Sequence, residues 1–192
     1  MPHKFDFKNK DRLDSPERKQ MLPPEQSLLK AGLKLGDIFV DIGCGTGYFS
    51  IPASRIVGKD GKVFALDISQ EMIAFITDKI RKDGSINNIV VLKSDSIRFP
   101  LPDNTATIVL VSNVLHESDD KPGFIREISR ILASRRRLAI IEWNKIHSDK
   151  GPPYEDRISG DEIKLLIEKE GFLLKTTESL SKDQALYLCE KQ

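Results

Sequence analysis

A short apolar run that opens into three closely spaced glycines constrains this chain more than any other feature. Residues 38–42 read Ile-Phe-Val-Asp-Ile, and their β-branched and aromatic side chains predict a buried strand. Gly43, Gly45 and Gly47 follow at alternate positions, where the missing Cβ atoms allow a tight turn and a close approach of a ligand to the backbone. We expect a helix from about Gly47 through Ser54, with its free N–H groups facing that ligand. The stretch therefore predicts a ligand-binding strand–loop–helix unit.

A second strand, predicted for residues 62–67, ends in the acid Asp67. This acid lies about 20 residues beyond the glycine loop, where a carboxylate binds ribose hydroxyls in dinucleotide-binding folds. Tyr48 occupies the position at which the G-x-G-x-x-G pattern needs its last glycine. An NAD-dependent oxidoreductase is therefore disfavoured, and we keep it as an alternative.

The glycine loop also resembles a known family. Residues 40–47, Val-Asp-Ile-Gly-Cys-Gly-Thr-Gly, resemble the first motif of the class I S-adenosylmethionine-dependent methyltransferases, in particular the small-molecule type similar to ubiquinone/menaquinone-biosynthesis methyltransferases. The resemblance covers the chain from about Glu25 to Leu188. It implies S-adenosyl-L-methionine as cofactor and methyl transfer to an acceptor, which we expect to be a small molecule. A protein that binds S-adenosylmethionine without transferase activity is a further alternative, because an intact cofactor site does not prove an acceptor site.

Predicted strands alternate with predicted helices, which indicates a doubly wound α/β fold. The strands are expected at residues 38–42, 62–67, 88–92, 106–111, 138–143, 172–180 and 184–190. The resemblance implies a mostly parallel seven-stranded sheet, the Rossmann-like methyltransferase fold, with an antiparallel last strand. We expect a single methyltransferase domain over residues 1–192. In it, residues 1–35 form an N-terminal helical extension and residues 36–192 form the α/β core.

The N-terminal extension has two interpretations of equal weight. In the family, such an extension lies over the cofactor and helps to form the acceptor pocket. Alternatively, it only covers an edge of the sheet. Helix starts are expected at Pro16 and Pro24, because proline is favoured in the first turn of a helix.

The resemblance also implies the cofactor-binding residues, motif by motif. The methionine part is assigned to Asp41, Gly43, Cys44, Gly45 and Asn113, the ribose to Asp67, and the adenine to Ile68, Asp95 and Ser96.

His116 is the candidate catalytic residue, since it follows the fourth predicted strand and function gathers at the C-terminal ends of parallel strands. Its imidazole is suited to act as a base near neutral pH, although a base is needed only if the acceptor must lose a proton. The alternative is that His116 simply lines the pocket or begins a helix. Trp143, His147 and Tyr154 are further candidates for the acceptor pocket.

Composition restricts the partners. A net charge of +1 gives no reason to expect a nucleic acid, and the three arginines within residues 133–137 are interpreted as a solvated turn. We expect no membrane span, because every apolar run is too short. Cys44 and Cys189 are far apart in the sequence, which favours a reduced, cytoplasmic protein. We expect no metal site.

Overall fold

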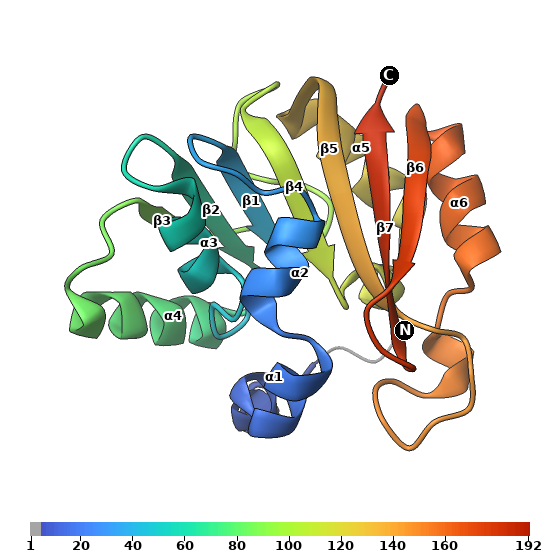
Figure 1. The fold of residues 1–192 in the computed structure, drawn as a ribbon, viewed down its shortest axis with the longest axis horizontal. Helices are drawn as coiled ribbons and strands as arrows, with labels where there is room; N and C mark the ends of the chain where they lie inside the picture. The colour runs from blue at the N-terminus through green and yellow to red at the C-terminus, as the bar shows by residue number, and fades with distance from the viewer. Residues whose placement is uncertain (1–4) are drawn as a thin grey trace.

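A seven-stranded sheet forms the centre of the protein in the computed structural model, which describes residues 5–192 (Figure 1). The strands are β1 (Ile38–Ile42), β2 (Lys62–Asp67), β3 (Ile89–Lys93), β4 (Ala106–Ser112), β5 (Leu132–Trp143), β6 (Phe172–Ser179) and β7 (Gln184–Lys191). Their order across the sheet is β3-β2-β1-β4-β5-β7-β6. The first five strands are parallel, and β7 runs antiparallel to both β5 and β6. The expected fold class is confirmed.

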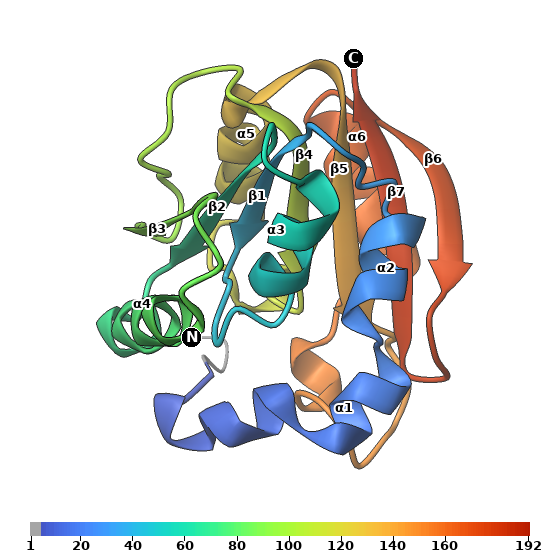
Figure 2. The ribbon, with the colours of Figure 1, turned by 60° about the vertical axis from the view of Figure 1, so that its left-hand side comes forward.

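Helices cover both faces of the sheet (Figures 1 and 2). One face packs against α2 (Pro24–Lys30), α3 (Ser50–Val57) and α4 (Gln70–Asp83), and the other packs against α5 (Lys121–Ile131) and α6 (Gly160–Lys169). Alternate residues of β4 divide between the two cores: Val109 and Val111 face α5, whereas Ile108 and Leu110 face α3. Burial on both faces explains why this strand is a continuous apolar run.

The chain order reverses between β1 and β4, because β1 connects outward to β2 and β4 connects outward to β5. In such a sheet the helices on the two sides diverge at the reversal, which leaves a crevice at the carboxyl ends of the two strands. An N-terminal segment lies across this end of the sheet. It consists of the 3-10 helix η1 (Phe7–Asp14) and the short helix α1 (Pro16–Met21), below the strand ends in Figures 1 and 2.

Helix α3 begins at Ser50, three residues later than expected. Pro52 explains the difference, because proline lacks an N–H and is tolerated only in the first turn of a helix. A start at Gly47 would place this proline beyond the first turn. Residues 43–49 instead form successive turns, in which the Gly47 amide donates to the Cys44 carbonyl oxygen at 2.9 Å.

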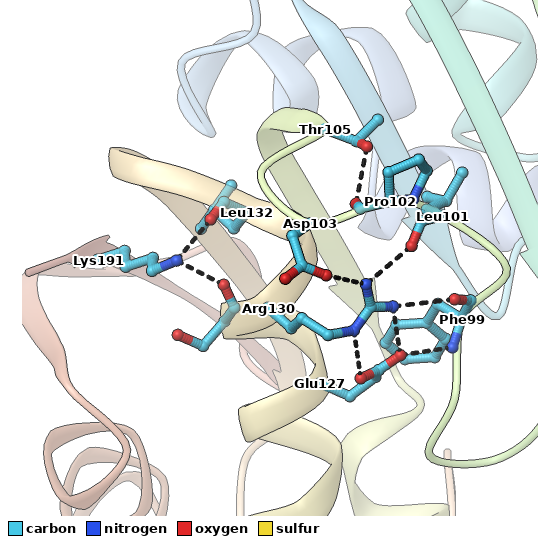
Figure 3. Close-up of polar contacts among 10 residues, drawn as sticks. Phe99, Leu101, Pro102, Asp103, Thr105, Glu127, Arg130, Leu132 and Lys191 are labelled. Atoms are coloured by element: carbon cyan, nitrogen blue, oxygen red, sulfur yellow. Dashed lines mark hydrogen bonds and ion pairs between the residues drawn. The ribbon is translucent and has the colours of Figure 1, made fainter.

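Turns and bends connect β3 to β4, so the strict alternation of strand and helix is broken there. Arg130 of α5 organises this connection (Figure 3). Its guanidinium donates to the carbonyl oxygens of Phe99 and Leu101 at 3.0 and 2.9 Å. It also pairs with Asp103 and Glu127, each at 2.7 Å. The planar guanidinium of Arg130 thus supports this connection, which consists of turns and bends rather than a helix.

The arginines at residues 135–137 lie within β5, and they differ in part from the expected solvated turn. Arg135 has a left-handed φ of 57°, and together with Arg136 it is exposed, as expected. Arg137 is half-buried instead, with its guanidinium 3.3 Å from the carboxylate of Asp37 and bonded to the carbonyl oxygen of Gly32. The cluster therefore includes a structural contact to the start of β1, and the structure assigns residues 132–137 to β5 with a register shift opposite Ala106 and Ile108.

The long segment between β5 and α6 is ordered around Arg157, whose side chain is buried although it carries a charge. Its guanidinium donates to the carbonyl oxygens of Pro152, Asn144 and Ile146 at 3.0, 3.1 and 2.8 Å. Such bonds satisfy the buried charge and fix the loop. Within residues 5–192, none of the helices is both long and apolar enough to cross a membrane.

The Arg130 cluster predicts a large difference between two arginines of one helix. Arg130→Met should lower the free energy of unfolding by about 1–3 kcal/mol, because it leaves two carbonyl oxygens and two carboxylates without their shared donor. Arg126→Met is the matched control, since Arg126 is mostly exposed and makes one ion pair, to Glu170 at 3.1 Å. Exposed pairs contribute little, so this variant should change stability by less than about 1 kcal/mol. Equal effects in urea denaturation would contradict the assigned role of Arg130.

Candidate functional site

A cavity of about 890 Å³ opens at the C-terminal ends of β1, β2 and β4. It lies where the chain order reverses, which is the position at which open α/β sheets bind their ligands. The loops after these strands form its floor, and residues of η1 and α1 form the opposite wall. The structure therefore supports the first interpretation of the N-terminal segment, as part of the pocket.

All ten residues singled out as candidate site residues line this cavity. They are Asp41, Gly43, Cys44, Gly45, Asp67, Ile68, Asp95, Ser96, Asn113 and His116. They come from four separate loops, so the fold brings together residues that lie up to 75 positions apart in the sequence (116 minus 41). Their individual roles remain predictions.

The glycine loop is fixed by its own amides. The N–H groups of Gly43 and Cys44 both donate to the carbonyl oxygen of Leu66, at 2.8 and 2.9 Å. The N–H of Gly45 donates to Oδ2 of Asp67 at 2.9 Å. These three amides are therefore bonded within the protein, and the expectation of free N–H groups at the start of the following helix stays a prediction. What the loop offers a ligand here is carbonyl oxygens and a surface without side chains.

Asp67 stands at the end of β2 with both carboxylate oxygens bonded to backbone. Oδ2 accepts from Gly45, and Oδ1 accepts from the amide of Ser69 at 2.8 Å. Each carboxylate oxygen has two acceptor sites, so one site on each oxygen is left for hydroxyl donors of a ligand. Burial raises the pKa of Asp67, against the lowering effect of these amides.

Asp41 is the most deeply buried acid of the site, with 2% of its surface exposed. Its Oδ2 accepts a hydrogen bond of 2.5 Å from the Ser50 hydroxyl. Burial raises its pKa to about 6, with a further contribution from the negative charge of Asp67, while Ser50 and Arg18 oppose the shift. The floor of the cavity therefore favours a positively charged ligand group over a negative one.

The N-terminal segment is attached to the glycine loop through Asp14. This carboxylate accepts from the Thr46 hydroxyl at 3.0 Å and pairs with Lys79 of α4 at 2.9 Å. Nearby, the Arg18 guanidinium lies 4.2 Å from the ring centre of Tyr48, whose hydroxyl donates to the Leu22 carbonyl oxygen at 2.6 Å. These contacts hold the wall of the cavity over the loop that it faces.

His116 lies in the short 3-10 helix η2 (Leu115–Glu117) and is paired with a buried acid of β5. Its Nδ1 is 2.9 Å from Oε2 and 3.2 Å from Oε1 of Glu142. Its other ring nitrogen, Nε2, is 3.9 Å from Oε1 of Glu117. Burial lowers the pKa of His116, but the hydrogen bond and charge of Glu142 and the charges of Glu117 and Asp156 outweigh it, so the pKa lies above its ordinary value.

Three buried polar side chains of the cavity wall have an atom without a hydrogen-bond partner among residues 5–192. These are Oγ of Ser112, Oγ of Ser118 and Oε1 of Gln184. Gln184 is 1% exposed, and its Nε2 donates to Oδ1 of Asn113 at 2.9 Å. Leaving a buried polar atom unpaired costs about 1–3 kcal/mol, so such atoms in a cavity wall mark a place for a polar ligand or water.

The aromatic candidates for the acceptor pocket separate in the structure. Trp143 lines the cavity, but His147 and Tyr154 are not among its described lining residues. Their rings stack on each other instead, with centroids 4.3 Å apart and an interplanar angle of 14°. Pro152 and Pro153 approach the cavity in their place.

Sequence reasoning missed Glu142, Gln184 and Arg18. Glu142 had a visible signal, because it is a charged residue at the end of the apolar run of β5. Gln184 and Arg18 had none, since a glutamine at the start of a strand and an arginine in a polar helix are ordinary surface patterns.

Comparison with known proteins is consistent with this site. Residues 40–140, which include the glycine loop, Asp67 and His116, match the family described as a methyltransferase domain. The chain belongs to the class I S-adenosylmethionine-dependent methyltransferases. The family assignment made from the glycine loop is thus confirmed, and with it S-adenosylmethionine as the cofactor of the family.

Two relatives are similar in sequence. A SAM-dependent methyltransferase from Aquifex aeolicus, known from a crystal structure, is 34% identical in sequence to this chain. The two structures match with a TM-score of 0.93, and the match covers 98% of this chain and 100% of that one. The ubiquinone/menaquinone biosynthesis C-methyltransferase UbiE of Escherichia coli is 32% identical over 115 residues, 60% of this chain. That alignment covers 46% of the Escherichia coli protein, so the chain matches about half of its length.

A third similarity concerns the fold alone. The cyclase SpnF has a TM-score of 0.75 at 18% identity, and the match covers 89% of this chain and 80% of that one. A protein described as a cyclase thus shares the fold, and the chemistry of a member has to be argued from its site.

Two buried aspartates, Asp41 of β1 and Asp37 directly before that strand, predict opposite effects for the same substitution. Asp41→Asn should raise the free energy of unfolding at pH 7 by about 1–3 kcal/mol, because it removes a buried charge. The native carboxyl binds its proton more tightly than the unfolded one, so the parent loses stability as pH rises from about 4 to 6. This loss should be smaller in the variant, as measured by urea denaturation between pH 4 and 7.

Asp37→Asn is the control, since Asp37 is equally buried but its carboxylate is satisfied. It accepts from the Thr107 hydroxyl at 2.8 Å and the Lys34 amide at 3.0 Å, and it pairs with Arg137 at 3.3 Å. This variant should lose about 1–3 kcal/mol. If Asp41→Asn is destabilised as much as Asp37→Asn, the charge on Asp41 is not a cost to the fold.

Proposed function

We propose that this chain catalyses transfer of a methyl group from S-adenosyl-L-methionine to a small molecule held in the cavity. The observation that carries the proposal is the cavity floor, where Asp41, Asp67 and the glycine loop meet at the carboxyl ends of β1 and β2. The floor adjoins a wall that contains His116. One enclosed space thus offers a place for a cofactor and a place for an acceptor side by side.

The residues present fit the cofactor. Asp67 keeps acceptor sites for the two ribose hydroxyls. The adenine is assigned to Ile68, Asp95 and Ser96, which line the same cavity. The methionine part is assigned to Asp41, Asn113 and the loop formed by Gly43, Cys44 and Gly45. The unpaired Oγ of Ser112 and Oε1 of Gln184 supply acceptors for polar groups on the same wall.

The charge of the floor supports the same ligand. S-adenosylmethionine, when bound, supplies a methyl group already activated on a positively charged sulfonium. Asp41 and Asp67 place negative charge on the cavity floor, and a bound cation there would lower the pKa of both acids toward ordinary values. The protein has then to align the acceptor and exclude water. We infer that η1 and α1 serve this purpose, because they close the cavity opposite the floor.

On the acceptor side, we propose His116 as a base for an acceptor that must lose a proton, with Trp143 as an apolar wall. We expect the acceptor to be a small molecule, because the site is a cavity and the net charge of +1 favours no polyanion. We further propose one methyltransferase domain, residues 1–192, acting in the cytoplasm. Its core is residues 36–192, and residues 1–35 are the N-terminal extension, of which η1 and α1 complete the pocket.

The test combines a ligand comparison with a change in the glycine loop. Gly45 has a φ of +52°, and a Cβ added there would lie 3.1 Å from Cδ1 of Leu13, across the cavity. Gly45→Val should therefore reduce the affinity for S-adenosylhomocysteine by roughly tenfold or more, a loss of about 1.4 kcal/mol or more, in calorimetric titration.

Gly84→Val is the matched control. Gly84 has a φ of +66° at the C-terminus of α4, away from the cavity, and a Cβ there meets no described atom within 4 Å. Backbone strain is therefore similar in both variants, and the control should keep the parent affinity. Unchanged affinity in folded Gly45→Val would overturn the loop assignment. Tight binding of NAD by the parent protein would overturn the cofactor class.

A further inference from the structure

The hydrogen-bonded pair of His116 and Glu142 is unusual because both partners are almost completely buried. The side chain of His116 is 5% exposed and that of Glu142 is 1% exposed. His116 lines the cavity, whereas Glu142 lies behind it and is not among the described lining residues. Glu142 therefore has no described contact with the cavity itself, and its hydrogen bond to the imidazole connects it to the cavity wall.

Burying this carboxylate is costly, and the surrounding groups compensate for it. Glu142 accepts from Nδ1 of His116, from the His116 amide at 3.3 Å and from the Trp143 amide at 3.2 Å. Buried ion pairs are weak contributors to stability, and an apolar pair of similar volume often serves the fold as well or better. A buried pair at a cavity wall with a raised histidine pKa is instead typical of a functional site.

We propose that Glu142 is a positioning residue, which fixes the proton of neutral His116 on Nδ1 and leaves Nε2 as a proton acceptor at the cavity. The inference rests on the proposed function and deepens it. A carboxylate only accepts hydrogen bonds, so the imidazole must donate from the nitrogen that faces Glu142. The acceptor's proton would then move to Nε2, and the resulting imidazolium would keep its bond to Glu142.

Three acids face this imidazole. Glu142 approaches Nδ1 from β5, Glu117 lies near Nε2 on the same short helix, and Asp156 acts from η3 (Tyr154–Asp156) at longer range. All three favour the protonated ring, and only Glu142 is hydrogen-bonded to it. Because the pKa of His116 is raised, the ring loses its proton-accepting role as pH falls below that value.

The experiment is a pH titration of the ¹⁵N-labelled protein by NMR, which needs no acceptor. The chain has three histidines, and His116→Asn identifies the signals of His116. In the parent at high pH, the nitrogen shifts should show the proton on Nδ1 and a bare Nε2. Glu142→Gln should lower the pKa of His116 by about one to three pH units, because burial then acts without its counter-charge.

Glu117→Gln is the matched control. It removes the same charge beside the same ring, but from the Nε2 side and without a hydrogen bond to Nδ1. It should lower the pKa less than Glu142→Gln and leave the proton on Nδ1. A merely structural role for Glu142 would leave the titration of a folded Glu142→Gln protein unchanged, or changed no more than in the control, and either result would overturn the proposal.

Two further measurements separate the possible failures. If Glu142→Gln does not fold, the tautomer of the parent still decides the matter, since a proton found on Nε2 contradicts the proposal directly. Titration of the parent with S-adenosylhomocysteine is independent of the imidazole measurement. If the parent does not bind S-adenosylhomocysteine, the proposed function is contradicted. If it binds but the proton of neutral His116 is on Nε2, only the role of Glu142 is contradicted.

Discussion

The carboxylate of Asp67 is the contact on which the site depends, because it joins two loops that come from different strands. One oxygen holds the amide of Gly45 and the other holds the amide of Ser69 at the start of α4. The glycine loop is thereby fixed against the end of β2, and Asp14 attaches the N-terminal segment to that loop through Thr46. These hydrogen bonds hold the floor and the wall of the cavity together.

The acids that order the site also lower the stability of the fold. Burial raises the pKa values of Asp41 and Asp67, and the charge of Asp67 raises the pKa of Asp41 further. The single nearby counter-charge described for Asp41 is Arg18, on the N-terminal segment. The acidic floor is electrostatically unfavourable by itself. A cationic cofactor would supply a positive charge there, and the relief of this cost would contribute to its free energy of binding. Proteins commonly give up stability in this way at functional sites.

Much of the fold was predictable from local patterns. The apolar runs at residues 38–42 and 62–67 predicted β1 and β2 with the bounds that the structure shows. The contacts that depend on tertiary packing were not predictable. Arg137 is part of an exposed-looking cluster, yet it reaches back to Asp37, 100 residues earlier. His116 was identified as a titratable residue after a strand, but its pairing with Glu142 required the alignment of β4 and β5.

The central claim is that the acidic floor binds the cofactor, and a crystal structure with S-adenosylhomocysteine tests it most directly. The ribose hydroxyls should lie within hydrogen-bond distance of Asp67, with the adenine beside Ile68 and the amino-acid part over Gly43 and Gly45. The N-terminal segment should cover the ligand. A ligand bound outside this cavity, or inside it with the ribose turned away from Asp67, would contradict the account.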